Sequence, residues 1–169
     1  YPGKRLLAVG HSAGGQLIGL ADNNELVHAM FAVSVQSGYW KHWSGLPRWF
    51  LALLWHVLMP GLVFALSYFP SRRIGVGEDL PGGVALEWAR WCRHPEYLVD
   101  RGGRPLRQHF ERYSGRIRAC VVTDDWMAPR AAVEALMSCF VTARVEFASL
   151  APTDVGACAL GHFGYFRET

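Results

Sequence analysis

The stretch KRLLAVGHSAGGQ, residues 4–16, decides the fold that we predict for this chain. Residues 4–10 form a short apolar run that ends in glycine, which is typical of a buried strand. Residues 13–22 follow with apolar side chains at helical spacing. At the junction, residues 10–14 (GHSAG) match the pattern G-x-S-x-G, in which a strand turns sharply into a helix and holds a serine hydroxyl above the end of the strand.

The residue types around Ser12 fit the crowding of such a turn. Side chains two positions to either side of the serine would collide there, which explains Gly10 and Gly14. Ala13 is small, and its backbone N–H, at the N-terminus of the following helix, would face a developing oxyanion. We therefore take Ser12 as a candidate nucleophile and expect its backbone to be strained.

Three more stretches, 29–35, 117–123 and 144–150, have the composition of short strands. Residues 130–140 predict an amphipathic helix behind Pro129, because proline suits the first turn of a helix. Short strands that alternate with helices predict an α/β chain with a parallel, doubly wound sheet.

One long segment interrupts this alternation between the second and third predicted strands. Residues 39–114 are rich in Trp, Phe and Leu and are too long for an ordinary connection. We therefore predict two core segments, 1–38 and 115–169, with a helical lid inserted between them at 39–114. The tryptophans of the insertion suggest an apolar acyl or aromatic substrate, although packing within a core explains them equally well. They include Trp43, Trp49, Trp55, Trp88 and Trp91.

Residues 49–69 carry no formal charge and are the most ambiguous segment of the insertion. A helix of this length would cross about 30 Å of bilayer core, and the arginines that flank it would suit the two membrane interfaces. His56 lies inside the segment, and a kink or break is expected at Pro60, which argues against a span. From the segment alone, a membrane span and a lid of apolar helices both stay open.

A serine nucleophile needs a base to take its proton, and the base needs an acid to fix its tautomer. His162 is the candidate base, because on this type of sheet the base follows the serine and the acid, and His162 alone lies beyond the acid candidates. It lies in the loop GHFG at 161–164. His11 is next to Ser12, but its side chain should point away from the hydroxyl. The other histidines come too early in the chain: His28, His42, His56, His94 and His109.

The preferred acid is Asp125, one of two aspartates that follow the third predicted strand. Pro129, four residues later, opens the next helix and leaves Asp125 on the loop at the carboxyl edge of the sheet. Asp124 stays an alternative acid, and one of the pair could instead cap the helix. Asp154 is a weaker candidate because it suits a turn.

The chain resembles the α/β-hydrolases, and among them bacterial predicted hydrolases of the serine aminopeptidase and monoacylglycerol-lipase-like group. Three motifs carry the resemblance, in the expected order: GHSAGGQ at 10–16, DDWMAP at 124–129 and GHFGYFR at 161–167. The resemblance implies an α/β-hydrolase fold and places the insertion where this fold carries its lid.

The same resemblance implies a role for each site residue, with Ser12 as nucleophile, Asp125 as acid and His162 as base. We also expect His11, Tyr39 and Trp40 to contact the substrate or the lid. Such hydrolases have several strands before the nucleophile strand, and loops of those strands supply the second oxyanion donor. We therefore expect this chain to be N-terminally truncated and to hold the C-terminal half of the sheet.

The resemblance also bears on the membrane question. A single span over 49–69 would place Ser12 on one side of the bilayer, with Asp125 and His162 on the other. Because a triad and a span are incompatible unless the segment doubles back at Pro60-Gly61, we expect a lid and no transmembrane span, while contact with a membrane surface stays open.

Composition excludes several other classes of protein. The composition of 51% hydrophobic and 18% charged residues excludes disorder for most of the chain. The net charge of +3 and the lack of a Lys/Arg block give no sign of nucleic-acid binding. The four cysteines are scattered, which predicts no zinc site, no disulfide framework and a cytoplasmic location.

We therefore expect a serine hydrolase that cleaves a carboxylic ester or related acyl bond through an acyl-enzyme, without a metal or organic cofactor. Its partner would be a small, apolar ester or acyl substrate. An acyltransferase with the same triad is one alternative. A noncatalytic module that binds lipid or a partner protein is the other.

Overall fold

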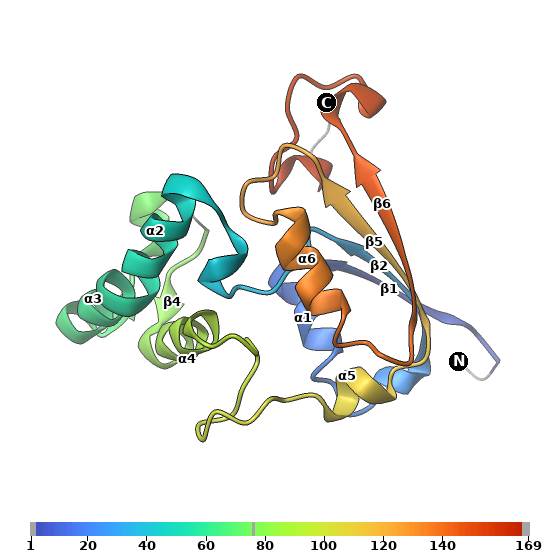
Figure 1. The fold of residues 1–169 in the computed structure, drawn as a ribbon, viewed down its shortest axis with the longest axis horizontal. Coiled ribbons are helices and arrows are strands. Elements are labelled where there is room, and N and C mark those ends of the chain that lie inside the picture. The colour runs from blue at the N-terminus through green and yellow to red at the C-terminus, as the bar shows by residue number, and fades with distance from the viewer. Residues whose placement is uncertain (1–2, 76, 167–169) are drawn as a thin grey trace. The chain divides into compact units, whose positions relative to one another are not determined.

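The computed structural model describes residues 3–75 and 77–166 (Figure 1). Its main sheet has the strand order β1-β2-β5-β6, and every neighbouring pair is parallel. These strands are β1 Leu6–His11, β2 Val27–Val33, β5 Arg116–Val122 and β6 Arg144–Leu150. Each lies within two residues of a predicted strand, which confirms the predicted parallel α/β sheet.

The register of the sheet brings the carboxyl ends of the strands to one edge. Gly10 of β1 pairs with Ala32 of β2, and Ala32 pairs with Ala119 of β5. The residues that follow β1 and β5 therefore emerge close together, although they are more than a hundred positions apart in the sequence. β1 is an edge strand of the described sheet, and Leu7 and Val9 on it are exposed.

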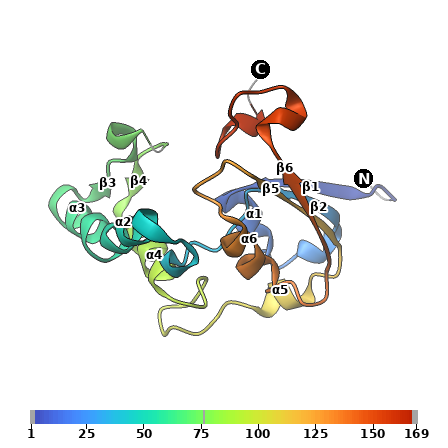
Figure 2. The same ribbon diagram turned by 45° about the horizontal axis from the view of Figure 1, so that its top comes forward.

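Helices α1 Ala13–Ile18 and α6 Arg130–Met137 lie on the same face of this sheet (Figures 1 and 2). On the other face, Leu160 and Tyr165 pack against a small cluster of buried strand residues. That cluster consists of Val33, Cys120 and Val122. The strand order, the sharp turn from β1 into α1 and these coverings are part of the α/β-hydrolase fold that the resemblance implies.

Both helices end before the sequence pattern does. α1 was expected to reach residue 22 but ends at Ile18, with Gly19 as its C-cap. The ring of Phe110 fills the space beside Gly19, where a Cβ would lie 2.1 Å from the ring atom Cε1. Phe110 belongs to α5 Gln108–Arg112 and packs on Phe140, with ring centroids 4.8 Å apart.

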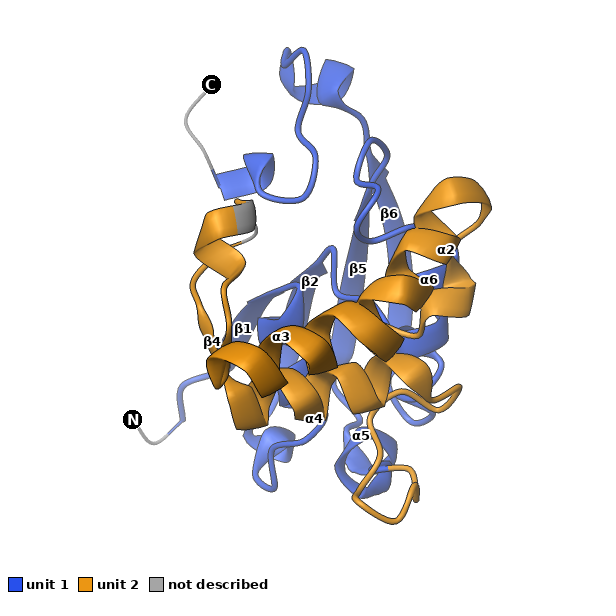
Figure 3. Cartoon of the chain, turned by 90° about the vertical axis from the view of Figure 1, so that its left-hand side faces the viewer, with its two compact units in different colours: residues 1–37, 106–169 blue, residues 38–105 orange. Residues whose placement is uncertain are grey.

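The chain forms two compact units, Tyr1–Ser37 with Leu106–Thr169 and, between these segments, Gly38–Pro105 (Figure 3). The first unit holds the main sheet. The second unit begins within one residue of the predicted insertion, which was expected to run on to residue 114, and its role as a lid stays a prediction. α5 lies with the main sheet because Asn24 donates from its side-chain amide to the His109 carbonyl at 2.8 Å.

The second unit is built on one long helix. α2 Gly45–Leu53 continues through a π-helical turn at Leu54–Leu58 into α3 Met59–Leu66. Of the kink or break expected at Pro60-Gly61, the break is absent, because the helix continues through this position. Pro60 lies in the first turn of α3, directly after the π turn, where the widened hydrogen-bond pattern tolerates a residue without an N–H.

The rest of the second unit packs around this helix. α4 Gly82–Arg93 lies against α3, and a short antiparallel pair joins β3 Tyr68–Phe69 to β4 Leu80–Pro81. By length and composition alone, the helix Gly45–Leu66 would be able to cross a membrane. The short 3-10 turns of the chain are η1 Asn24–Leu26, η2 Trp40–His42, η4 Ser71–Ile74, η5 Pro152–Val155 and η6 Gly164–Phe166.

Candidate active site

Ser12 lies in a strained turn between β1 and α1. Its φ of 48° and ψ of −128° are rare for any residue with a side chain. Two hydrogen bonds hold the turn. The N–H of Ser12 donates to the carbonyl of Val33 on β2, and the carbonyl of Ser12 accepts from the N–H of Gly15, each at 3.1 Å. The strain expected from the sequence is therefore present at the predicted position.

The glycines around Ser12 differ in how closely other atoms approach them. A Cβ on Gly10 would lie 2.5 Å from the backbone Cα of Gly15, so Gly10 is required, as the sequence predicted. The expected collision at Gly14 is wrong for the described chain, because a Cβ there would meet no atom within 4 Å. The second crowded position is Gly15, where a Cβ would lie 2.2 Å from Cγ2 of Val35. Sequence reasoning missed it because Val35 comes from beyond β2.

The three residues predicted as a triad lie in one line of hydrogen bonds. Nε2 of His162 is 2.8 Å from Oγ of Ser12, and Nδ1 of His162 is 2.7 Å from Oδ2 of Asp125. We assign the tautomer in which Nδ1–H donates to the carboxylate, because that leaves Nε2 free to accept the serine proton. Asp125 and His162 are both buried, so this line of contacts is shielded from water along most of its length.

The carboxylate of Asp125 is held in its ionised form. Burial alone would raise the pKa of Asp125, but His162, the hydroxyl of Ser34 and the backbone N–H of Met127 hold that pKa below its ordinary value. Oδ1 accepts the N–H groups of Met127 at 2.9 Å and Ala128 at 3.2 Å. Both are in the loop before α6, and this loop fixes one oxygen while the other faces His162.

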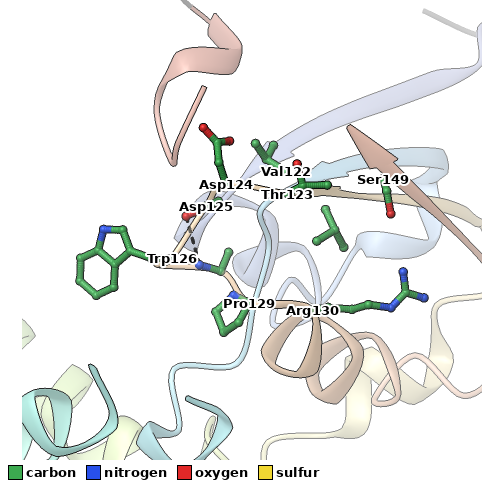
Figure 4. A pocket seen from close by; sticks show the side chains of 10 residues that line it. Val122, Thr123, Asp124, Asp125, Trp126, Pro129, Arg130 and Ser149 are labelled. Carbon is green, nitrogen blue, oxygen red and sulfur yellow. Dashed lines mark hydrogen bonds between the residues drawn. The ribbon is translucent and has the colours of Figure 1, made fainter. Parts of the chain in front are cut away.

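Asp124 binds a different part of the chain from Asp125. Its Oδ2 accepts the N–H of Leu160 at 2.9 Å, and its Oδ1 accepts the N–H of Gly161 at 3.1 Å. Figure 4 shows the two carboxylates pointing in different directions from the end of β5. Asp124 thus binds the backbone just before His162, and Asp125 binds the imidazole. Asp124 was the alternative acid in the sequence analysis.

His11 contacts the same loop from the other side. The Nε2–H of His11 donates to the carbonyl of His162 at 2.7 Å, and the two rings lie 4.9 Å apart between centroids. Phe163 and Phe166 pack edge-on against the ring of His11. A contact of His11 with substrate or lid stays a prediction. Its contact with the backbone of His162 was not predicted, since nothing local in the sequence indicates it.

The remaining predicted site residues lie at the start of α1 and in the second unit. Ala13 is the first residue of α1, so its N–H has no carbonyl partner within the helix. Tyr39 and Trp40 belong to the second unit, where their rings are 6.2 Å apart and the amine of Lys41 lies 5.3 Å from the ring of Trp40. Contact of either ring with substrate stays a prediction.

A depression of about 460 Å³ lies at the end of β5, beside the acid. Figure 4 shows the side chains around it. Ser12 and His162 are not among its lining residues, so we do not assign it to the reacting bond. The lining residues are Val121, Val122, Thr123, Asp124, Asp125, Trp126, Ala128, Pro129, Arg130 and Ser149. Within residues 3–75 and 77–166, no group of three His, Cys, Asp or Glu side chains is placed to hold a metal ion.

No protein-family model and no curated protein sequence matches this chain. Several solved structures are similar to it at low sequence identity. Est816, an N-acyl homoserine lactone degrading enzyme, is 13% identical, with a TM-score of 0.42 over 86% of this chain and 59% of its own. A monoacylglycerol lipase from Paleococcus ferrophilus is 13% identical, with a TM-score of 0.45 over 87% and 59% of the two chains.

An α/β fold family hydrolase from Bacillus anthracis is likewise 13% identical, with a TM-score of 0.44 over 85% of this chain and 59% of its own. This chain therefore spans about three fifths of the length of each of these proteins. The assignment of part of an α/β-hydrolase fold rests on the strand order and the turn at Ser12 described above.

Proposed function

We propose that this chain carries the catalytic residues of a serine hydrolase that cleaves a carboxylic ester or a related acyl bond. The observation that supports the proposal is the continuous line from Asp125 through His162 to Oγ of Ser12, with separations of 2.7 and 2.8 Å. A nucleophile, a base within hydrogen-bond reach and a third group that orients the base are what acyl transfer to a serine requires.

The reaction would run in two halves. Ser12 attacks the substrate carbonyl as Nε2 of His162 takes its proton, and the same nitrogen then gives that proton to the leaving alcohol. Water, activated by His162, hydrolyses the acyl-enzyme and restores Ser12. Asp125 keeps Nδ1–H in place and stabilises the imidazolium throughout. The N–H of Ala13, at the start of α1, would donate to the oxyanion of each tetrahedral intermediate.

The substrate class follows from the residues rather than from any bound molecule. Serine chemistry of this kind needs no metal and no organic cofactor, so we propose a small ester or acyl compound as the partner. The aromatic content of the second unit favours an apolar acyl group. The scattered cysteines keep the cytoplasm as the expected location.

A fluorophosphonate probe tests the proposal, because it reacts covalently with an activated serine. The intact protein should be labelled, and Ser12→Ala should abolish the label. Ser44→Ala removes another serine, one that precedes α2, and is the matched control that should leave labelling unchanged. Labelling that survives Ser12→Ala, or none in the folded protein, would refute the assignment. Product analysis with an added alcohol separates hydrolysis from acyl transfer.

A further inference from the structure

The long helix of the second unit is apolar on its outward side. Five of its exposed large side chains follow one another at spacings of four, three, four and seven residues, which places them on one face, while Trp49, Leu58 and Leu66 are exposed outside this series. We call this face the outer stripe; it consists of Leu46, Phe50, Leu53, Val57 and Phe64. Phe64 is 95% exposed and Leu46 is 86% exposed, so these are not side chains at the margin of a core.

The opposite side of the same helix is also apolar. Leu51, Trp55, Met59 and Val63 recur every four residues and are buried. Trp55 packs on Trp88 of α4, with ring centroids 5.6 Å apart. A helix that lies on a globular unit in water normally presents polar side chains outward. Here both sides are apolar, so the outer stripe exposes apolar side chains to water at positions where polar side chains are usual.

Positive charge flanks the stripe at its N-terminal end, whereas the arginines at its C-terminal end lie beside the acidic residues Glu78 and Asp79. Between Glu25 and Glu78 the sequence contains no Asp or Glu, whereas Lys41 and Arg48 precede the helix core and Arg72 and Arg73 follow it. Arg72 is paired with Glu78 at 2.9 Å. The guanidinium of Arg48 lies 5.3 Å from the ring of Trp40 and 5.7 Å from that of Trp49. Tryptophan beside basic side chains is the composition that anchors proteins at the lipid headgroup level.

We propose that the outer stripe docks on the surface of a bilayer that contains anionic lipids, with the helix lying in the plane of the interface. The apolar side chains enter the boundary between headgroups and acyl chains, and the flanking cations contact the anionic headgroups. The inference does not depend on the proposed reaction.

Two other arrangements fit the structure less well. If the helix crossed the bilayer, α4 would be drawn toward the hydrocarbon with it, and α4 carries the ion pair of Glu87 and Arg90. If a second copy covered the stripe with the two helices parallel, the basic N-terminal ends that carry Lys41 and Arg48 would face each other. Anionic headgroups have no such repulsion.

Sedimentation with vesicles tests the proposal. The chain should bind phosphatidylcholine vesicles that contain phosphatidylglycerol, bind pure phosphatidylcholine vesicles more weakly, and be released by high salt. The double variant Val57→Ser/Phe64→Ser should weaken binding at least about tenfold. The matched control is Val84→Ser on α4, since Val84 is 54% exposed and Val57 is 57% exposed. This control should bind as the unchanged chain does.

A second variant keeps the apolar surface intact. Lys41→Gln/Arg73→Gln should lose about fivefold in affinity for each charge removed and should prefer anionic vesicles less than the unchanged chain does. The proposal is overturned if neither kind of vesicle is bound, or if Val57→Ser/Phe64→Ser binds unchanged. It is also overturned if that variant only abolishes self-association, if it only lowers the unfolding temperature, or if the bound chain resists both salt and alkaline washing as a spanning helix does. Ser12→Ala should bind normally, which separates this result from the fate of the proposed reaction.

Discussion

Asp124 holds Gly161 by its backbone N–H at 3.1 Å, directly before His162. A second bond from the same carboxylate, to the N–H of Leu160, makes the contact bidentate. The side chain of Asp124 therefore fixes the approach of the loop, and its neighbour Asp125 fixes the imidazole that the loop carries. The two adjacent aspartates at the end of β5 thus position His162 together: Asp124 binds the backbone that precedes it, and Asp125 binds its ring.

Removing this contact should slow the reaction without weakening substrate binding. For Asp124→Ala we expect kcat to fall about tenfold and KM to stay unchanged, because two charge-assisted hydrogen bonds to the loop are lost while the reacting groups remain. Asp124→Asn keeps an acceptor oxygen and should recover part of the loss. The control is Asp154→Ala, which removes an aspartate that accepts the N–H of Ala151 instead. Equal losses for Asp124→Ala and Asp154→Ala would contradict this positioning role.

His11 should act on the same loop from β1. His11→Ala removes the N–H that binds the carbonyl of His162, and we expect kcat to fall by about fivefold to tenfold with the rate of fluorophosphonate labelling falling in parallel. His11→Gln retains an N–H donor of similar reach and should restore most of the rate. His28→Ala, at an exposed histidine on β2, serves as the control. If glutamine were no better than alanine, the hydrogen bond would not be the cause.

The contacts of Asp124 and His11 with the loop of His162 were not predicted from the sequence. The strands could be predicted because apolar runs between turn residues are local, and β6 lies where its alternating pattern placed it. The chain order of Ser12, Asp125 and His162 followed from the topology of the sheet. The contact of His11 with the carbonyl of His162 joins residues 151 positions apart and depends on the path of an irregular loop. No local pattern encodes that path.

The same limit explains the errors in the helices. The end of α1 is set by Phe110, a ring from α5 that occupies the space beside Gly19. Pro60 was expected to kink or break the long helix, yet the helix continues through a π turn directly before this residue. In both cases tertiary packing or a rare backbone pattern outweighed the intrinsic preference of the residue.

The two adjacent glycines in the first turn of α1 should respond in opposite ways to substitution. Gly15→Ala would place a Cβ 2.2 Å from Val35, and we expect the free energy of unfolding to fall by about 1–3 kcal/mol. Gly14→Ala meets no atom within 4 Å and should be neutral or raise that free energy by up to about 1 kcal/mol, because alanine favours the helix. Urea unfolding of both variants measures the difference. A stabilised Gly15→Ala, or a Gly14→Ala as damaging as Gly15→Ala, would contradict the packing described for this turn.

The lowered pKa of Asp125 predicts how stability depends on pH. Because the carboxyl is more acidic in the folded chain than in the unfolded chain, its ionised form adds stability at pH values above the unfolded pKa of about 3.9. That contribution is lost as the pH falls from there through the folded pKa. Asp125→Asn cannot ionise, so the difference in unfolding free energy between the unchanged chain and this variant should be constant near neutral pH and shrink in acid.

Chemical unfolding of the two proteins across this pH range measures that difference, and activity supplies an independent readout. Asp125→Asn puts an amide in place of the carboxylate that holds Nδ1–H of His162, so this variant should also lower kcat by up to about 10⁴-fold, through the wrong imidazole tautomer. Asp124→Asn, one position earlier, should show neither the full loss of rate nor the same pH-dependent difference in stability. A difference that grows as the pH falls would mean that burial, which raises the pKa of Asp125, outweighs the hydrogen bonds from His162 and Met127.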